Sequence, residues 1–299
     1  MDRGFWFGVA ANLMWGFFPL YWKQLQHVPA LQLLGHRILW SFPLLLLMLF
    51  LRREGKTFRK EIASLRTVLI YAAAAVFLSA NWLTYVWAVN AGYIVETSLG
   101  YFINPLFSML LGVVILRERL RPFQWIPVCL AAAGVLYLTF VYGSFPWIGL
   151  TVAFSFGMYG FIKKTAPLDA LHGLTLETAI LFLPALAILF ISEGAGQGAF
   201  GHAGAESDLL LVGAGAVTIV PLLLFAAATR RITLFMVGVL QYITPTLSFL
   251  TGVLVFGEPL SAERLTGFVI IWLALILLAV EGYIARRRSG IPAVTSRSP

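Results

Sequence analysis

Ten runs of about 20 apolar residues limit what this chain can fold into more than any other feature of its sequence. A helix needs about 20 apolar residues to cross a bilayer, and in lipid the backbone must satisfy its own hydrogen bonds, as helices and closed barrels do. Only 11% of the residues are charged, against roughly 25% in a soluble domain. We therefore predict an all-α polytopic membrane protein. The ten transmembrane helices are predicted at about 5–22, 33–51, 68–89, 95–116, 123–141, 145–162, 174–192, 209–228, 235–256 and 265–284.

The basic residues predict how the chain crosses the membrane. With ten spans, 18 of the 21 Lys and Arg residues fall on one side, Lys23 and Arg264 fall on the other, and Arg37 lies inside the second span. Cytoplasmic loops carry an excess of Lys and Arg, so both termini are predicted to be cytoplasmic. The net charge of +8 then marks orientation in the lipid bilayer, and the sequence contains no nucleic-acid-binding motif.

A stretch of the first half recurs 140 residues later. Residues 101–120, YFINPLFSMLLGVVILRERL, align with residues 241–260, QYITPTLSFLTGVLVFGEPL. The identical pairs are Ile103/Ile243, Pro105/Pro245, Ser108/Ser248, Leu110/Leu250, Gly112/Gly252, Val113/Val253, Glu118/Glu258 and Leu120/Leu260. Apolar composition alone does not supply matched Pro, Ser, Gly and Glu, so the alignment indicates an internal duplication.

The duplication predicts two inverted five-helix repeats. Because five spans per half is an odd number, the second copy must enter the membrane from the opposite face. The predicted units are residues 1–143 for the first repeat, 144–288 for the second, and 289–299 for a disordered cytoplasmic tail. Residues 193–208, rich in Gly and Ala, are expected to form a mobile outer loop. Inverted repeats are typical of carriers that work by alternating access, with the substrate bound near the midplane.

Two matched prolines mark the midplane of the fourth and ninth spans. A helix kink is predicted at Pro105 and at Pro245, because proline lacks an N–H and frees the carbonyl four residues back. These carbonyls belong to Tyr101 and Gln241, and in lipid each must find a neighbour, water or ligand. The alternative is that the prolines only kink the helices and that neighbouring side chains satisfy the backbone.

Polar and aromatic residues on helix faces near the midplane are the predicted substrate-binding residues. Polar groups inside a membrane usually face protein or water and not lipid. For each of them, an interhelical hydrogen bond without ligand contact is the alternative. The predicted lining residues are Asn12, Trp15, Asn81, Tyr85, Tyr101, Asn104, Ser108, Tyr159, Gln241, Tyr242 and Ser248.

Arg37 and three glutamates near helix ends define the charge pattern expected of the spans. Arg37, next to His36, needs a partner or water at that depth, and Glu96 at the start of the fourth span is the expected partner. A gate or structural pair is favoured over a clamp for a substrate carboxylate. Glu177 and Glu281 fall about one turn from cytoplasmic helix ends, where we expect solvated carboxylates. Trp22 is expected in the interfacial aromatic belt.

The sequence disfavours an enzyme and predicts no cofactor or metal. The four histidines fall on separate connectors or helix ends, and there is no HExxH, Asp-rich or GxSxG motif. The single cysteine, Cys129, excludes a disulfide within the chain. A channel would tolerate polar midplane residues, but inverted duplication is less expected of it. No obligatory protein partner is evident.

Several strings resemble a known transporter family. They are HRILWS at 36–41, NW at 81–82, WAVN at 87–90, SLGYFINP at 98–105 and QYITP at 241–245. They resemble the RarD-type (chloramphenicol-sensitivity) proteins of the EamA family, in the drug/metabolite transporter superfamily, with a fold similar to that of YddG-type amino-acid exporters. The resemblance implies a ten-helix carrier of the bacterial inner membrane that exports or exchanges small metabolites, foremost amino acids. Efflux of chloramphenicol-like drugs is the alternative.

Overall fold

The computed structural model describes residues 3–91, 93–143, 145–257 and 262–289, and this part of the chain is helical apart from short connections. The first half contains α1 (Arg3–Gly16), α2 (Phe18–Trp22), α3 (Ala30–Leu51), α4 (Gly55–Glu61), α5 (Leu65–Asn90), α6 (Ile94–Val114) and α7 (Trp125–Tyr142). Short 3-10 turns cover Lys23–Leu25 and Pro122–Gln124. The second half contains α8 (Trp147–Thr165), α9 (Ala170–Gly194), α10 (Ala205–Thr229), α11 (Leu234–Gln241), α12 (Ile243–Leu254) and α13 (Ala262–Ser289).

Each predicted span falls on one helix or on two consecutive helices. Seven segments of the described chain are long and apolar enough to cross a membrane. They are Ala30–Leu51, Leu65–Ala88, Pro122–Val141, Ala170–Gly194, Ala205–Thr229, Leu234–Leu254 and Leu265–Ala285. Within α6 the apolar part is shorter, Gly100–Val114. The protein is therefore an all-helical polytopic membrane protein, with α4 as a short additional helix of the first half.

The first and ninth predicted spans are interrupted, whereas the fourth is not. Pro19 stands in the first turn of α2, where a missing N–H costs nothing. The break between α11 and α12 falls at Tyr242, three residues before Pro245. In the first copy, α6 continues through Pro105 without a break.

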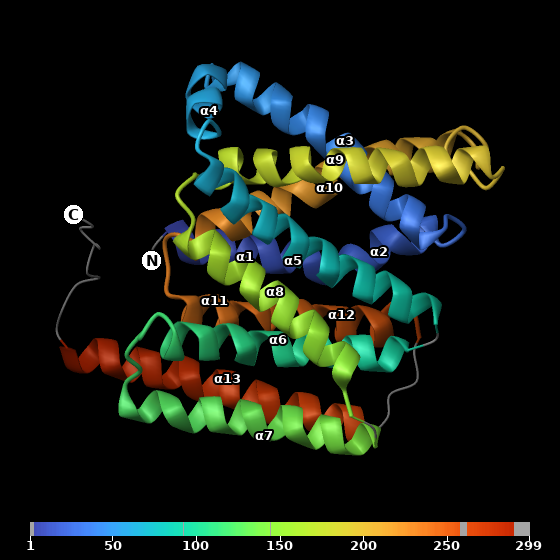
Figure 1. Ribbon diagram of the computed structural model, residues 1–299. Helices are drawn as coiled ribbons and strands as arrows, with labels where there is room; N and C mark the ends of the chain where they lie inside the picture. The colour runs from blue at the N-terminus through green and yellow to red at the C-terminus, as the bar shows by residue number, and fades with distance from the viewer. Residues whose placement is uncertain (1–2, 92, 144, 258–261, 290–299) are drawn as a thin grey trace.

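The repeated stretches run in opposite directions through the bundle. In Figure 1, α6 begins at the side of the bundle where α12 ends, and it returns toward the side where α11 begins. The two copies pack directly on each other through α6 and α11. A Cβ on Gly238 of α11 would lie 2.6 Å from the Pro105 carbonyl oxygen and 2.8 Å from Met109 Cγ. Only glycine permits the backbones to approach this closely.

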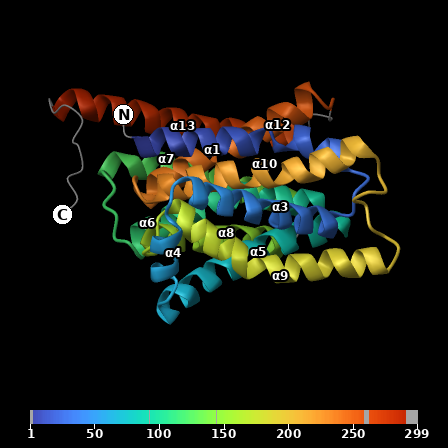
Figure 2. The ribbon, with the colours of Figure 1, turned by 90° about the horizontal axis from the view of Figure 1, so that it is seen from above.

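Two apolar cores hold the helices together. The larger core lies between helices of both halves and includes Leu45, Leu78, Leu174 and Phe225, all buried. A second core joins α7 and α13 to the crossing of α6 and α11. Figures 1 and 2 show α7 and α13 running side by side at the edge of the bundle.

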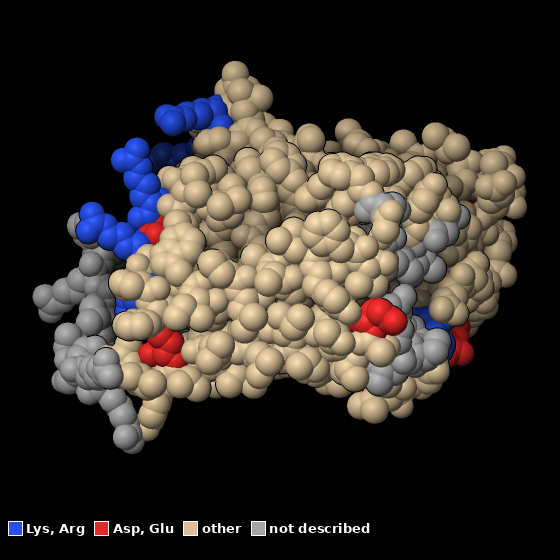
Figure 3. Space-filling model, turned by 90° about the horizontal axis from the view of Figure 1, so that it is seen from below, with Lys and Arg blue, Asp and Glu red and all other residues tan. Residues whose placement is uncertain are grey.

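The outer surface has the pattern of a membrane protein. Many large apolar side chains remain exposed, as on Phe50, Leu69, Leu183 and Leu254. A broad band without Lys or Arg crosses the face drawn in Figure 3, and the basic side chains gather mainly at one end. Lipid tails can cover such a band, because they replace water as the solvent of the apolar side chains.

Two segments differ from the loop and tail expected from the sequence. The connection between α9 and α10 is hydrogen-bonded to α3. Gln32 Nε2 donates to the Gln197 carbonyl at 2.6 Å, and Gln32 Oε1 accepts from the Ala199 amide at 2.9 Å. The flanking residues of the expected mobile loop belong to α9 and α10. Helix α13 includes Ser289, and the rest of the predicted tail, 290–299, lies outside the described residues.

Candidate functional site

Buried polar residues gather where α6 crosses α11. Asn104 and Ser108 on α6 and Gln241 on α11 are all buried. Because Gly238 contacts Pro105 and Met109, Asn104 and Ser108 lie within one helical turn of this crossing, as does Gln241. The crossing thus places a buried polar residue of the second repeat, Gln241, near two of the first, Asn104 and Ser108.

Four polar atoms at this crossing have no hydrogen-bond partner in the described part of the chain. They are Asn104 Oδ1, Gln241 Oε1, Gln241 Nε2 and the Tyr242 hydroxyl. More than 90% of buried polar groups are normally hydrogen-bonded, and an unsatisfied group costs about 1–3 kcal/mol. Asn104 and Gln241 therefore hold hydrogen-bonding capacity that the protein itself does not use.

Other predicted lining residues are engaged within the protein. Asn12 Nδ2 donates to the Gly8 carbonyl at 2.8 Å, and Asn12 Oδ1 accepts from Thr244 Oγ1 at 3.0 Å. The Ser248 hydroxyl reaches the Gly16 carbonyl at 3.5 Å. These contacts tie α1 to α12, which is the interhelical role left open for Asn12 and Ser248.

Asn81 and Trp15 likewise contact neighbouring helices. Asn81 Nδ2 donates to the Val152 carbonyl at 2.8 Å, which links α5 to α8. The Trp15 ring lies 5.6 Å from Phe156 and 5.4 Å from Phe225, centroid to centroid. Both residues therefore fasten the halves together at the centre of the bundle.

Arg37 occupies an aromatic site between α3 and its neighbours. Its guanidinium carbon lies 4.9 Å from the Trp22 ring centroid and 4.6 Å from the Trp82 ring centroid. Its Nε donates to Thr218 Oγ1 on α10 at 3.0 Å. Trp22, which the sequence placed in the interfacial belt, is therefore part of the Arg37 environment. The expected partner Glu96 has a side chain outside the described residues.

Tyr85 and Tyr101 complete the surroundings of Arg37. Their ring centroids lie 6.0 Å apart, edge to face, and Tyr85 follows Trp82, whose ring faces the guanidinium, by three residues on α5. Each side chain keeps 38% of its surface accessible. Neighbouring His36 points elsewhere, with its ring 5.3 Å from Phe200 in the connection before α10.

A narrow cavity lies between the Arg37 region and the opposite end of the bundle. Its volume of about 10 Å³ leaves room for roughly one water molecule. It is lined by Ile38, Ser41, Leu78, Trp82, Leu174, Glu177, Thr178, Leu181, Thr218, Ile219 and Leu222. None of the predicted lining residues borders it. The cavity is lined from α3, α5, α9 and α10, whereas the predicted site was centred on the repeated stretches in α6, α11 and α12.

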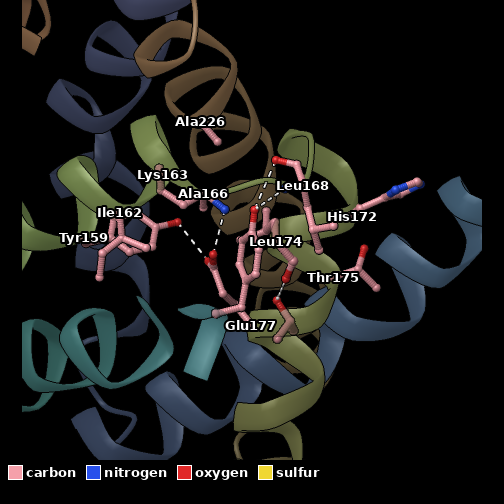
Figure 4. Close-up of polar contacts among 12 residues, drawn as sticks. Tyr159, Ile162, Lys163, Ala166, Leu168, His172, Leu174, Thr175, Glu177 and Ala226 are labelled. Atoms are coloured by element: carbon pink, nitrogen blue, oxygen red, sulfur yellow. Dashed lines mark hydrogen bonds and ion pairs between the residues drawn. The ribbon is translucent and has the colours of Figure 1, made fainter. Parts of the chain in front are cut away.

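Glu177 closes one end of this cavity as part of a buried ion pair. Its Oε1 lies 2.7 Å from Lys163 Nζ, and its Oε2 accepts from the Tyr159 hydroxyl at 3.1 Å (Figure 4). Glu177 is only 1% exposed and Lys163 only 3%. The expectation that Glu177 is a solvated carboxylate is therefore wrong, because α9 packs against α3, α5 and α10 and two side chains of α8 cover the carboxylate. Glu281, also expected to be solvated, pairs with Arg121 at 2.8 Å.

Glu118 connects the end of the first copy of the repeat to the start of the second. Its two carboxylate oxygens accept from the Leu234 and Phe235 amides at 2.7 and 2.8 Å. It thus caps the N-terminus of α11, where the helix dipole favours a negative charge. Lys164 stands 4.0 Å away; burial lowers the pKa of Lys164, and the charge of Glu118 partly opposes this shift. The matched Glu258 lies outside the described residues.

A histidine at the basic end is surrounded by three carboxylates. His172 Nδ1 lies 2.6 Å from Glu61 Oε2, and His172 Nε2 lies 3.3 Å from Glu54 Oε2. Asp169 caps the first turn of α9 through the His172 amide at 2.9 Å. The ligand atoms of Glu54, Asp169 and His172 are close enough to hold a metal ion, a cluster that the sequence reasoning did not anticipate. Both ring nitrogens already face carboxylates, so the contacts suffice to hold α4 against α9.

Two repeated helical halves, joined in one membrane-embedded bundle, define the class of this protein as a duplicated polytopic membrane protein. Residues 2–140 and 146–280 match the EamA-like transporter family, and the chain belongs to that family. It is a membrane transporter, and the proteins that it resembles are transporters rather than enzymes.

Relatives of nearly the same length occur in several bacteria. The chain is 46% identical to "Uncharacterized transporter YojE" of Bacillus subtilis, in an alignment that covers 92% of this chain and 93% of that protein. It is 38% identical to "Protein RarD" of Escherichia coli, with 96% and 97% covered. It is 32% identical to "Chloramphenicol-sensitive protein RarD" of Pseudomonas aeruginosa, with 92% and 93% covered. A solved crystal structure, 18% identical, shares the fold with a TM-score of 0.71 over 93% of this chain and 98% of that one.

Proposed function

We propose that this protein carries small metabolites, foremost amino acids, across the bacterial inner membrane by alternating access. It would cross the membrane ten times as two inverted five-helix repeats, with both termini in the cytoplasm. Export or exchange would take place at a site near the midplane, between the repeats. The opposite directions of α6 and α11–α12 support the inversion. In carriers with inverted repeats, a pseudo-two-fold axis in the membrane plane relates the two repeats.

The unsatisfied polar atoms at the crossing of α6 and α11 carry this proposal. Asn104 and Gln241 hold acceptors and donors that the described protein leaves unused. A zwitterionic amino acid brings an ammonium group that needs acceptors and a carboxylate that needs donors. A substrate at the crossing would remove the cost of about 1–3 kcal/mol per unsatisfied group. Tyr85 and Tyr101 would donate hydrogen bonds to the carboxylate through their hydroxyls, and their rings would add an aromatic wall that holds apolar side chains.

Drug efflux is the second candidate. It is favoured by one observation, the name of the Pseudomonas aeruginosa relative, "Chloramphenicol-sensitive protein RarD". Chloramphenicol is a neutral aromatic molecule, so the aromatic side chains near Arg37 would suit it better than the charged groups would.

The direct test is counterflow of radiolabelled amino acids in proteoliposomes. We expect Asn104→Ala and Tyr101→Phe to weaken substrate affinity about ten- to a hundredfold, because each removes a hydrogen bond to a charged ligand group. Trp125→Phe is the matched control, since Trp125 is exposed on α7 at the edge of the bundle. If both midplane variants keep wild-type affinity and flux while correctly folded, the substrate binds elsewhere.

A further inference from the structure

The positive charge of Arg37 has no ion-pair partner among the described side chains. The described ion pairs use Arg121, Lys163, Lys164, His172 and His202. Trp22 and Trp82 face the guanidinium, and ring quadrupoles attract a cation without neutralising it. An anion at this point would compensate a charge that the described side chains leave unpaired.

The geometry of the guanidinium determines which kind of anion fits. Arginine has five N–H donors in a planar fork, and the fork matches a carboxylate with two parallel hydrogen bonds. Nε is already bonded to Thr218, which fixes the plane of the group and leaves the Nη1 and Nη2 edge. Among the described residues, neither Nη1 nor Nη2 donates a hydrogen bond in addition to the one from Nε.

We propose that Arg37, together with the Tyr85 and Tyr101 hydroxyls, is a subsite for the carboxylate of the substrate. Tyr85 follows Trp82 by three residues on α5 and so shares the helix face that meets the guanidinium, and Tyr101 stands against Tyr85. Their hydroxyls supply further donors for carboxylate oxygens, while their partly exposed side chains contact the substrate's carbon chain. This assignment rests on the proposed transport function and narrows its substrates to carboxylates. Arg37 then binds the substrate, and the gate or structural pair between Arg37 and Glu96 that the sequence suggested is not its role.

The neighbouring helix positions suggest how a complete amino acid would lie. Asn104 follows Tyr101 by three residues on α6, so the two side chains share a helix face. The unpartnered Asn104 Oδ1 would then accept from the ammonium group while Arg37 binds the carboxylate. Amines without a carboxylate and neutral drugs lack the group that Arg37 recognises.

The test uses calorimetric titration of the purified full-length protein with three matched probes: L-phenylalanine, 3-phenylpropanoate and phenethylamine. We expect the two carboxylates to bind and phenethylamine to bind at least tenfold more weakly. Arg37→Gln should weaken carboxylate binding about ten- to a hundredfold, and Arg37→Lys should weaken it less because the charge remains. Arg231→Gln is the matched control, since Arg231 also lies over an aromatic ring, 5.4 Å from the Phe7 centroid, but just beyond the C-terminal end of α10.

Three results would overturn the assignment. One is that no carboxylate of the series binds, or that phenethylamine binds as tightly as they do. Another is tighter binding of inorganic phosphate than of either carboxylate. The third is that Arg37→Gln and Glu96→Gln lower the melting temperature equally without changing binding, as a structural pair predicts. Carboxylate binding without counterflow of any amino acid would instead contradict the proposed transport and leave the subsite in place.

Discussion

At the scale of single residues, the buried charges need the most explanation. Lys163 and Glu177 are almost completely enclosed. Their charges are compensated by each other, by the Tyr159 hydroxyl and by the Tyr71 and Tyr159 rings that face the Lys163 ammonium group. Removing two ions from water costs several kcal/mol per ion, and close pairing returns part of this cost. Such a pair contributes less to stability than its short distance suggests, but removing one of its members destabilises the protein strongly.

We predict that Glu177→Ala destabilises the protein by about 3–5 kcal/mol, because it leaves an uncompensated buried ammonium group. The double variant Lys163→Met/Glu177→Leu should recover most of this loss, since no buried charge remains. Unfolding midpoints in detergent provide the measurement. Glu281→Gln is the control: its partner Arg121 has a side chain 47% exposed, and such pairs contribute less than about 1 kcal/mol. A double variant as unstable as the single one would contradict this account.

At the scale of helices, α6 and α11 approach each other closely at one of the contacts between the two halves. Gly112 and Gly238 both lie at this interface, where a Cβ on Gly112 would come within 2.9 Å of the Phe235 amide nitrogen. The cap that Glu118 provides to α11 joins the same two helices at their basic end. A carrier of this design has to preserve these contacts, or exchange them, whenever the halves move.

Gly238→Ala should force α6 and α11 apart, because its Cβ would meet the Pro105 carbonyl oxygen at 2.6 Å. Overpacking of this kind costs about 1–3 kcal/mol. We expect a lower melting temperature and a lower rate of counterflow. Gly282→Ala in α13 is the matched control, since a Cβ there meets nothing within 4 Å and alanine favours the helix. Equal effects of the two substitutions would show that the α6–α11 contact is not limiting.

At the scale of the whole molecule, the distribution of basic residues predicts orientation. Arg52 and Arg53 precede the short helix α4, and Lys56, Arg59 and Lys60 belong to it. This helix lies at the end of the bundle where Arg230 and Arg231 follow α10. An excess of Lys and Arg on one side marks the cytoplasmic face.

A reporter enzyme fused after Gly55 should therefore report cytoplasm, and one inserted between 193 and 208 should report the outside. Fusions at the C-terminus should agree with the first. The same location for Gly55 and for 193–208 would refute the orientation, and it would also remove the basis for the inverted repeat.

The amino-acid sequence was sufficient to predict the helical membrane class, the duplicated halves and the transporter family. These properties depend on local quantities: the length of an apolar run, the spacing of matched residues, and short strings such as SLGYFINP at 98–105. The midplane polar residues could also be selected from the sequence, because a polar group inside an apolar run is visible without a fold.

Only the tertiary structure decided which partners those groups have. Arg37 meets Thr218 across 181 residues of chain, and Trp22, expected at the interface, faces its guanidinium. Glu177, expected in water, is enclosed because its helix α9 packs against α3, α5 and α10. Burial and pairing arise from contacts between helices far apart in the sequence, and the apolar pattern of a single helix does not specify which neighbour covers it.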